Sequence, residues 1–276
     1  MPLSNKIFAH RGLSSVLPEN TLPAIEKALE SDIQGVEFDI ELSKDGVPFL
    51  VHQENFVPND DLNQLLLVAP QKRRAWVSQY FAESLGKMDA GRWFSENFAG
   101  LSLCTLQAAL SLDWNSKIAL MEIKDELYWD SKSPHPSQRE IIDALKKPLS
   151  QFIETGCKAQ ILSFSPNILG ICREVFPNVE LIQLVSSYNF FQDLLAVSTD
   201  HLSAFAVSEK MALKHPEIFP AVKSKGKEIY VYERTNYREI SGKIDDINER
   251  KQLWSKLIDS GVNGIITNYA GFGRAG

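Results

Sequence analysis

Short β-branched segments alternate with amphipathic helical segments along almost the whole chain, and this alternation constrains the fold more than any other feature. Eight segments have strand character: Lys6–His10, Gly35–Leu42, Lys117–Lys124, Ala159–Phe164, Glu180–Val185, Ala204–Ser208, Glu228–Tyr232 and Gly264–Asn268. Helical patterns lie between them: Leu22–Glu30, Thr105–Leu112, Ser137–Glu154, Pro166–Phe176, Phe190–Ser198, Pro216–Lys223 and Glu249–Ser260. Strands joined through helices pair in parallel, and eight such units can close on themselves. The pattern predicts an α/β fold with one domain over residues 1–276, a (β/α)8 TIM barrel, with a doubly wound open sheet as the alternative.

The amino-acid composition argues against several classes of binding partner and of structure. The 276 residues carry 29 basic and 35 acidic side chains, a net charge of −6, which argues against a nucleic-acid or anionic-membrane binder. No apolar run approaches the roughly 18 residues of a membrane span, and the first residues lack the pattern of a secretory signal. Three cysteines are too few for a disulfide framework or a zinc site. We therefore expect a cytoplasmic protein.

One region interrupts the alternation. Lys44-Asp45-Gly46 is a turn signal, and the apolar run Val47–His52 after it predicts that the second strand doubles back as a hairpin. Residues 53–104 then carry many aromatic side chains without a clear strand or helix pattern, which is too long for a barrel connection. We interpret this region as an insertion whose aromatics form either a satellite core or a lid over the substrate.

Charged side chains lie inside two of the predicted strands. Because side chains alternate between the two faces of a strand, Glu37, Asp39 and Glu41 share one face of the second strand. Glu122 and Lys124 share a face of the next barrel strand. Buried carboxylates repel one another unless a cation lies between them or one is protonated. The pattern indicates a hard-cation site beside an anion-binding position, the alternative being solvated ion pairs at the strand ends.

Two histidines occur where predicted strands end. His10 closes the first strand, directly before Arg11, and His52 closes the run that follows the hairpin turn. A histidine can donate or accept a proton near neutral pH, and the planar guanidinium of arginine suits phosphate. Both lie at the carboxyl ends of predicted strands, where active sites of this fold lie, and together with Arg11 they indicate an acid/base pair beside a phosphate-binding arginine, the alternative being core or loop histidines.

Short strings in a fixed order carry a family resemblance. They are His10-Arg11-Gly12, Pro18-Glu19-Asn20-Thr21, Gly35-Val36-Glu37-Phe38-Asp39-Ile40, Lys44-Asp45-Gly46, Val51-His52, Asp89-Ala90-Gly91-Arg92-Trp93-Phe94, Glu122-Ile123-Lys124, Leu162-Ser163-Phe164-Ser165 and Gly261-Val262-Asn263-Gly264-Ile265-Ile266-Thr267-Asn268. In these strings, and over essentially the whole chain, the sequence resembles the glycerophosphodiester phosphodiesterase family.

The resemblance implies a (β/α)8 barrel that hydrolyses a glycerophosphodiester to sn-glycerol 3-phosphate and an alcohol, using one divalent cation, Mg²⁺ or Ca²⁺. It implies metal ligands, a catalytic acid/base pair and phosphate contacts at seven positions, respectively Glu37, Asp39 and Glu122, His10 and His52, and Arg11 and Lys124. It leaves open which histidine is the acid, and whether water or a neighbouring glycerol hydroxyl attacks first, the latter giving a cyclic intermediate.

The sequence departs from the family pattern at two walls of the expected site. The family usually has an acidic residue after the second histidine, where this chain has Gln53, and a tryptophan near the end of the seventh strand, where it has Tyr232. Both changes leave the metal and phosphate positions intact, so they affect the choice of substrate and not the reaction. Phe164 and Tyr232 are candidate substrate-binding walls, the alternative being core packing.

Two other functions follow from the same residues. A lysophospholipase D-type activity would use the aromatic insertion to accept an acyl chain. A non-catalytic phosphodiester-binding scaffold would lack a ligand or a histidine, and none of the seven positions is missing.

Overall fold

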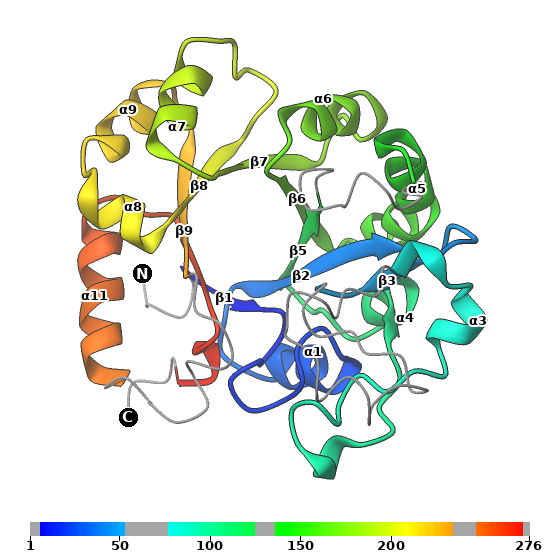
Figure 1. Cartoon of the computed structure of the whole chain (residues 1–276). Helices are drawn as coiled ribbons and strands as arrows, with labels where there is room; N and C mark the ends of the chain where they lie inside the picture. The colour runs from blue at the N-terminus through cyan, green and yellow to red at the C-terminus, as the bar shows by residue number, and fades with distance from the viewer. Residues whose placement is uncertain (1–5, 53–76, 125–135, 234–246, 273–276) are drawn as a thin grey trace.

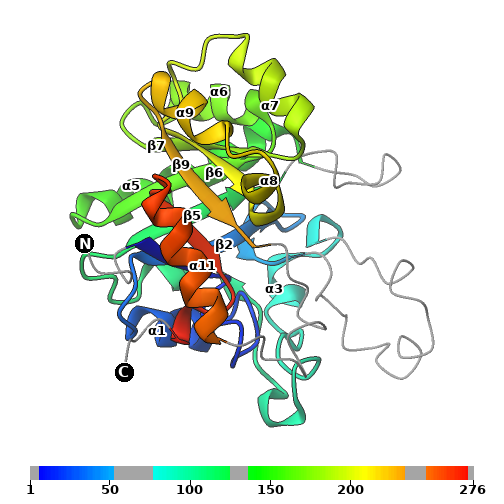
Figure 2. The ribbon, with the colours of Figure 1, turned by 90° about the vertical axis from the view of Figure 1, so that its left-hand side faces the viewer.

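The computed structural model describes residues 6–52, 77–124, 136–233 and 247–272. Its centre is a closed barrel of parallel strands with helices around the outside (Figures 1 and 2). Around the barrel, each strand pairs with the next and the last pairs with the first: β1 (Ile7–His10), β2 (Gly35–Leu42), β5 (Ile118–Ile123), β6 (Lys158–Ser163), β7 (Glu180–Val185), β8 (Ala204–Ser208), β9 (Glu228–Tyr232) and β10 (Gly264–Thr267). The predicted (β/α)8 barrel is confirmed, and the open sheet is wrong because β1 pairs with β2 as well as with β10.

The helices cover the outer face of the barrel with their apolar sides. They are α1 (Leu22–Leu29), α4 (Leu106–Leu110), α5 (Gln138–Glu154), α6 (Pro166–Val175), α7 (Tyr188–Leu195), α8 (Glu209–Lys214), α9 (Ile218–Ser224) and α11 (Ile247–Asp259). N-capping side chains set where two of these helices begin. Ser137 and Glu140 form a capping box at the start of α5, and Ser165 caps α6 directly before Pro166. The largest buried side chain of α11, Trp254, lies in the main core between helices and strands.

The inward face of the barrel changes character along the strands. Its amino-terminal part is an apolar inner cluster made of Phe8, Ile118, Leu120, Leu162, Ile182, Leu184, Ala204, Ala206, Tyr230 and Ile266. Two residues farther along the same strands, the inward positions become polar: Phe8 is followed by His10, Leu120 by Glu122, and Ile266 by Asn268. The charged side chains therefore lie at the carboxyl end of the barrel, next to the apolar inner cluster that fills its amino-terminal part.

A hairpin leaves the barrel after β2, as the sequence predicts. β3 (Pro48–Leu50) runs antiparallel to β2, and a short strand that the sequence pattern does not indicate, β4 (Cys104–Thr105), pairs with β3. The segment between them includes η5 (Val77–Gln79), α3 (Ala82–Leu85) and η6 (Glu96–Phe98). Residues 53–76 of the predicted insertion, with Phe56 and Trp76, lie outside the described residues.

A small satellite core lies under the described part of the insertion. It consists of Phe49, Val51, Val77, Leu85 and Met88, with Tyr80 packed against it. Most side chains of this core are aliphatic, and among the aromatic residues of the predicted insertion Tyr80 packs against it. Phe81 is 53% exposed, while the ring of Phe94 contacts those of Trp93 and Phe98 edge to face.

The connection between β8 and β9 differs from its prediction. The sequence pattern indicates one helix there, Pro216–Lys223, whereas the structure has α8 and α9. Ser208 caps α8 by accepting a hydrogen bond from the backbone N–H of Met211 at 3.3 Å. Pro216 separates the two helices because the residue before a proline avoids the helical region, and His215 has φ −130° and ψ 66°.

None of the helices described combines the length and the apolar character that a bilayer span requires.

Close packing at the start of β2 leads to a prediction about stability. A Cβ atom on Gly35 would lie 2.3 Å from the carbonyl oxygen of Ile118 and 3.0 Å from the ring of Phe8. We expect Gly35→Ala to lower the free energy of unfolding by about 1–3 kcal/mol, measured by urea denaturation, because the backbone of β5 cannot yield cheaply. Gly170→Ala in α6 is the matched control: beyond its chain neighbours and the backbone of its own helix, no atom lies within 4 Å of its Cβ position, so it should raise stability by about 0.5–1 kcal/mol. An equally stable Gly35→Ala variant would contradict the packing described here.

Candidate active site

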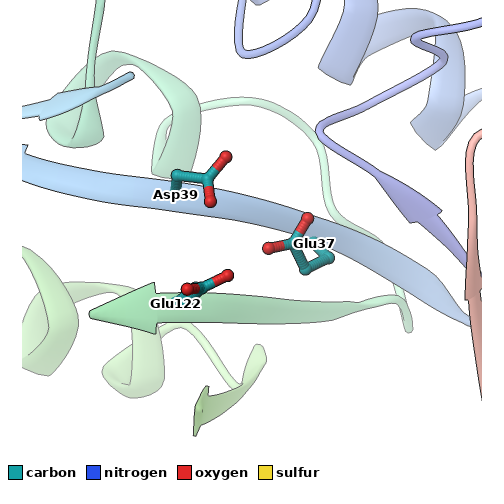
Figure 3. A group of neighbouring side chains, drawn as sticks. All are labelled: Glu37, Asp39 and Glu122. Carbon is teal, nitrogen blue, oxygen red and sulfur yellow. The ribbon is translucent and has the colours of Figure 1, made fainter. Parts of the chain in front are cut away.

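Three carboxylates meet at the carboxyl end of the barrel. Glu37 and Asp39 come from β2 and Glu122 from β5, where Asp39 and Glu122 are register partners (Figure 3). Each offers one oxygen within 4.8 Å of the others, and their residues are 2%, 0% and 8% exposed. The period-2 pattern of β2 places Glu37 and Asp39 on the inward face. The structure thus brings together the three residues that the resemblance implies as metal ligands.

Two cationic side chains compensate part of this charge. The Lys124 ammonium contacts Asp39 and lies 2.7 Å from Glu122 Oε1, and Arg11 Nε lies 3.0 Å from Asp39 Oδ2. Burial alone would lower the pKa of Lys124, but Asp39 and Glu122 raise it, so the ammonium stays charged. Burial would raise the pKa of Asp39, but Lys124 and Arg11 hold it well below its usual range.

The other two carboxylates are less well compensated. Burial raises the pKa of Glu37 well above its usual value, and the charges of Asp39 and Glu122 add to this effect. Burial also raises the pKa of Glu122, against the opposing effect of Lys124. A divalent cation would favour the ionised form of all three. Three buried hard oxygen donors at this spacing fit such an ion, so Glu37, Asp39 and Glu122 could hold one.

The two predicted histidines lie beside these acids. His10 Nε2 is 3.8 Å from Glu37 Oε2, and burial, reinforced by Arg11, lowers the pKa of His10 to about 3. Burial also lowers the pKa of His52 well below its usual value, again with help from Arg11 and with Lys124. The Nδ1 atom of His52 is buried and has no hydrogen-bond partner within the described ranges. Before any ligand binds, both imidazoles are therefore neutral around pH 7.

The loop after β1 supports the acids through contacts that the sequence did not reveal. Asn20 donates from Nδ2 to Asp39 Oδ2 at 2.9 Å, and its Oδ1 accepts the backbone N–H of Asp39 at 3.3 Å. Its φ of 57° is a conformation that asparagine tolerates better than most residues. Glu19 Oε1 accepts a hydrogen bond from Arg11 Nη1 at 2.6 Å. Both residues stand in a string noted above only as part of the resemblance, and their spacing to Asp39 gives no signal of contact.

Asn268 orients His10 from the far end of the chain. Its Oδ1 lies 2.7 Å from His10 Nδ1 and 3.0 Å from the hydroxyl of Ser14. A carboxamide oxygen accepts hydrogen bonds, so this contact favours the His10 tautomer with the proton on Nδ1 and leaves Nε2 as the acceptor facing Glu37. The two residues are 258 positions apart, and they become neighbours only because β1 pairs with β10.

The predicted wall residues also meet at this end of the barrel. Phe164 follows β6, Tyr232 ends β9, and their rings contact each other edge to face with centroids 6.2 Å apart. Both pack on the inner cluster, and the Tyr232 hydroxyl donates to the carbonyl of Val185 at 3.0 Å. The departure at Gln53 lies outside the described residues.

Comparison with known proteins decides the family. Residues 10–271 match the model of the glycerophosphoryl diester phosphodiesterase family, which is nearly the whole chain. The chain belongs to this family. Its resemblance to these enzymes, predicted from the sequence, is confirmed.

Individual relatives agree with the assignment. A glycerophosphodiester phosphodiesterase of Bacillus altitudinis is 25% identical over 266 residues, covering 96% of this chain and 94% of that protein. One of Bacillus subtilis is 26% identical over 276 residues, covering 95% and 82%. Among solved structures, a phosphodiesterase of Oleispira antarctica in complex with the product sn-glycerol-3-phosphate has a TM-score of 0.71 at 20% identity, covering 97% of this chain and 94% of that one. At this identity the structural likeness supports the fold alone.

The fit of the three carboxylates to an ion predicts a change in thermal stability. We expect saturating Mg²⁺ or Ca²⁺ to raise the melting temperature of the wild-type protein relative to the protein in EDTA. An ion at a free concentration of about 100 times its Kd adds about 2.7 kcal/mol to the free energy of unfolding. Glu122→Gln, which keeps the side-chain shape and removes one charge, should lose most of this shift. Glu83→Gln, on the exposed helix α3, should keep it. A shift of equal size in both variants would show that the ion binds elsewhere.

Proposed function

We propose that the protein hydrolyses glycerophosphodiesters to sn-glycerol 3-phosphate and an alcohol, with one Mg²⁺ or Ca²⁺ ion held by Glu37, Asp39 and Glu122. The observation that supports it most is the convergence of these acids with two cations and two neutral imidazoles at the carboxyl end of a family barrel. When bound, the ion would polarise a phosphoryl oxygen and offset negative charge that builds up during substitution at phosphorus.

The side chains around the acids position the phosphodiester. Arg11 and Lys124 keep permanent positive charge in a buried setting, where electrostatic attraction is stronger than in water. The guanidinium is held by Glu19 and Asp39, so it is ordered before a substrate arrives. A dianionic transition state would gain more from this arrangement than the monoanionic diester, which is the condition for catalysis.

His10 and His52 move protons in the proposed reaction. One imidazole accepts the proton of the attacking hydroxyl, the new oxygen–phosphorus bond forms, and the ester bond to the alcohol breaks. The other imidazole must carry an extra proton to donate to the departing alkoxide, and the negative charge of a bound phosphodiester would favour this imidazolium form. Asn268 supports this role for His10 because it fixes which ring nitrogen carries the proton. His52 has no such hydrogen-bond partner for its buried Nδ1 among the described residues.

A panel of substrates and cations tests the function. Wild-type protein should release sn-glycerol 3-phosphate from glycerophosphocholine, glycerophosphoethanolamine or glycerophosphoglycerol with Mg²⁺ or Ca²⁺, and release should stop after chelation. Including lysophosphatidylcholine separates this activity from a lysophospholipase D-type reaction, which would prefer the acylated substrate. Absence of turnover on every diester, with a cation shown to be bound, would contradict the proposal.

A variant tests the role of His52. We expect His52→Ala to lower kcat by at least ~100-fold, since loss of one acid/base group costs about that factor, without changing the melting temperature by more than a few degrees. His201→Ala is the control: this histidine precedes β8, at the amino end of the barrel, and its backbone carbonyl makes the contact with Arg173. Normal turnover by His52→Ala would refute the assignment.

A further inference from the structure

A buried carboxylate directly after β9 has no role in the mechanism above. Glu233 is 4% exposed, and it faces α11, opposite to Tyr232, whose ring packs on the inner cluster. Its Oε1 atom accepts hydrogen bonds from Arg250 Nη1 and from Trp254 Nε1, each at 2.9 Å. Burying a carboxylate without partners is costly, so these two donors offset the cost of placing it behind the barrel wall.

The second carboxylate oxygen of Glu233 holds the end of β10. Oε2 accepts a hydrogen bond from the hydroxyl of Thr267, the last residue of that strand, which is fully buried. The same hydroxyl oxygen accepts the backbone N–H of Tyr269 at 3.0 Å. The guanidinium of Arg250 lies over the Tyr269 ring, 4.8 Å from its centroid. Both neighbours of Asn268 in the chain are thus held by the Glu233–Arg250 pair.

Asn268 itself faces the interior of the barrel. Ala9 pairs with Thr267 across β1 and β10, so Asn268 is level with His10. There its Oδ1 atom lies 2.7 Å from His10 Nδ1. Hydrogen bonds weaken steeply at poor angles, so the carboxamide must stay in place for this contact to select one tautomer of His10. The contacts of Thr267 and Tyr269 hold the backbone on either side of the carboxamide from outside the barrel.

A contribution to stability alone does not explain a charged pair at this place. Replacing a buried ion pair by well-packed apolar side chains is often neutral or stabilising, whereas a retained pair can fix one arrangement of the surrounding chain. Arg250 Nη1 lies 2.9 Å from Glu233 and 3.4 Å from Glu209 of α8, so it joins α8, the end of β9 and the turn after β10. A position beside the turn that contains Asn268 favours an orienting role.

We propose that Glu233 is a positioning residue for His10. Its contact with Thr267 fixes the turn that contains Asn268, and the carboxamide then keeps the proton of His10 on Nδ1, with Nε2 available as the acceptor. This inference rests on the proposed function, in which His10 moves a proton. Glu233 faces α11 and not the barrel interior, so its loss should lower kcat and leave KM nearly unchanged.

Glu233→Gln tests the proposal. The carboxylate accepts from three donors, Arg250, Trp254 and Thr267, whereas a carboxamide has one oxygen and adds donors of its own, so at least one contact is lost. We expect kcat to fall by about 10-fold or more with KM changed by less than about 2-fold, since misplacing a reacting group from a distance can cost up to ~100-fold. The ¹⁵N spectrum of histidine-labelled full-length protein in Mg²⁺, assigned with His10→Ala, should change from the Nδ1–H tautomer of His10 to a mixture of both.

Three further variants serve as controls. Glu209→Gln removes a carboxylate beside Arg250 and leaves the Glu233–Thr267 contact intact, so it should keep the wild-type kcat and the His10 tautomer. Thr267→Val keeps the side-chain shape without the hydroxyl and should reproduce the losses of Glu233→Gln. Thr267→Ser keeps the hydroxyl and should retain kcat within about 2-fold.

Each outcome decides the proposal. A lower melting temperature in Glu233→Gln, with wild-type kcat and an unchanged His10 tautomer, would show a purely structural role and overturn it. If Glu233→Gln does not fold, the two Thr267 variants decide, and equal kcat with the same His10 tautomer in both would overturn it. The tautomer measurement needs no turnover. Inactive wild-type protein would overturn the proposed function, whereas a tautomer that responds to Glu233→Gln would still support the positioning and one that does not respond would overturn it.

Discussion

Repulsion among three buried carboxylates is the constraint on which the rest of this site depends. Glu37, Asp39 and Glu122 lie within 4.8 Å of one another at a place where water cannot screen them. Arg11 and Lys124 offset this repulsion by pairing with Asp39, the acid whose pKa is lowered well below its usual range. The loop after β1 holds two of these acids: Asn20, in a left-handed conformation, donates a hydrogen bond to Asp39, and the backbone N–H of Arg11 donates to Glu37.

Apolar and charged side chains occupy different ends of the barrel interior. Its amino-terminal half is filled by the apolar inner cluster, and the helices pack apolar side chains on its outer face. This apolar burial stabilises the fold and offsets the free-energy cost of burying charged side chains on the inward face of the carboxyl half. Glu41, the next inward acid of β2, continues this change in character along the strand.

The sequence predicted those parts of the molecule that local periodicity controls. All eight barrel strands follow from β-branched runs, and the alternation in β2 and β5 alone put the acids on one face. What periodicity cannot show are contacts made by barrel closure: Asn268 reaches His10 only through the pairing of β1 with β10. Short elements were missed for a different reason. β4 has two residues and α8 six, too few for a hydrophobic period to be recognised.

A diffraction experiment on crystals soaked with Mn²⁺ tests the central claim most directly, because the anomalous signal locates the ion without reference to activity. Coordination of one ion by Glu37, Asp39 and Glu122, with oxygen distances of about 2.0 to 2.6 Å, is the predicted result. An anomalous map with no peak among these three side chains at saturating Mn²⁺, or with its only peak elsewhere, would contradict the account.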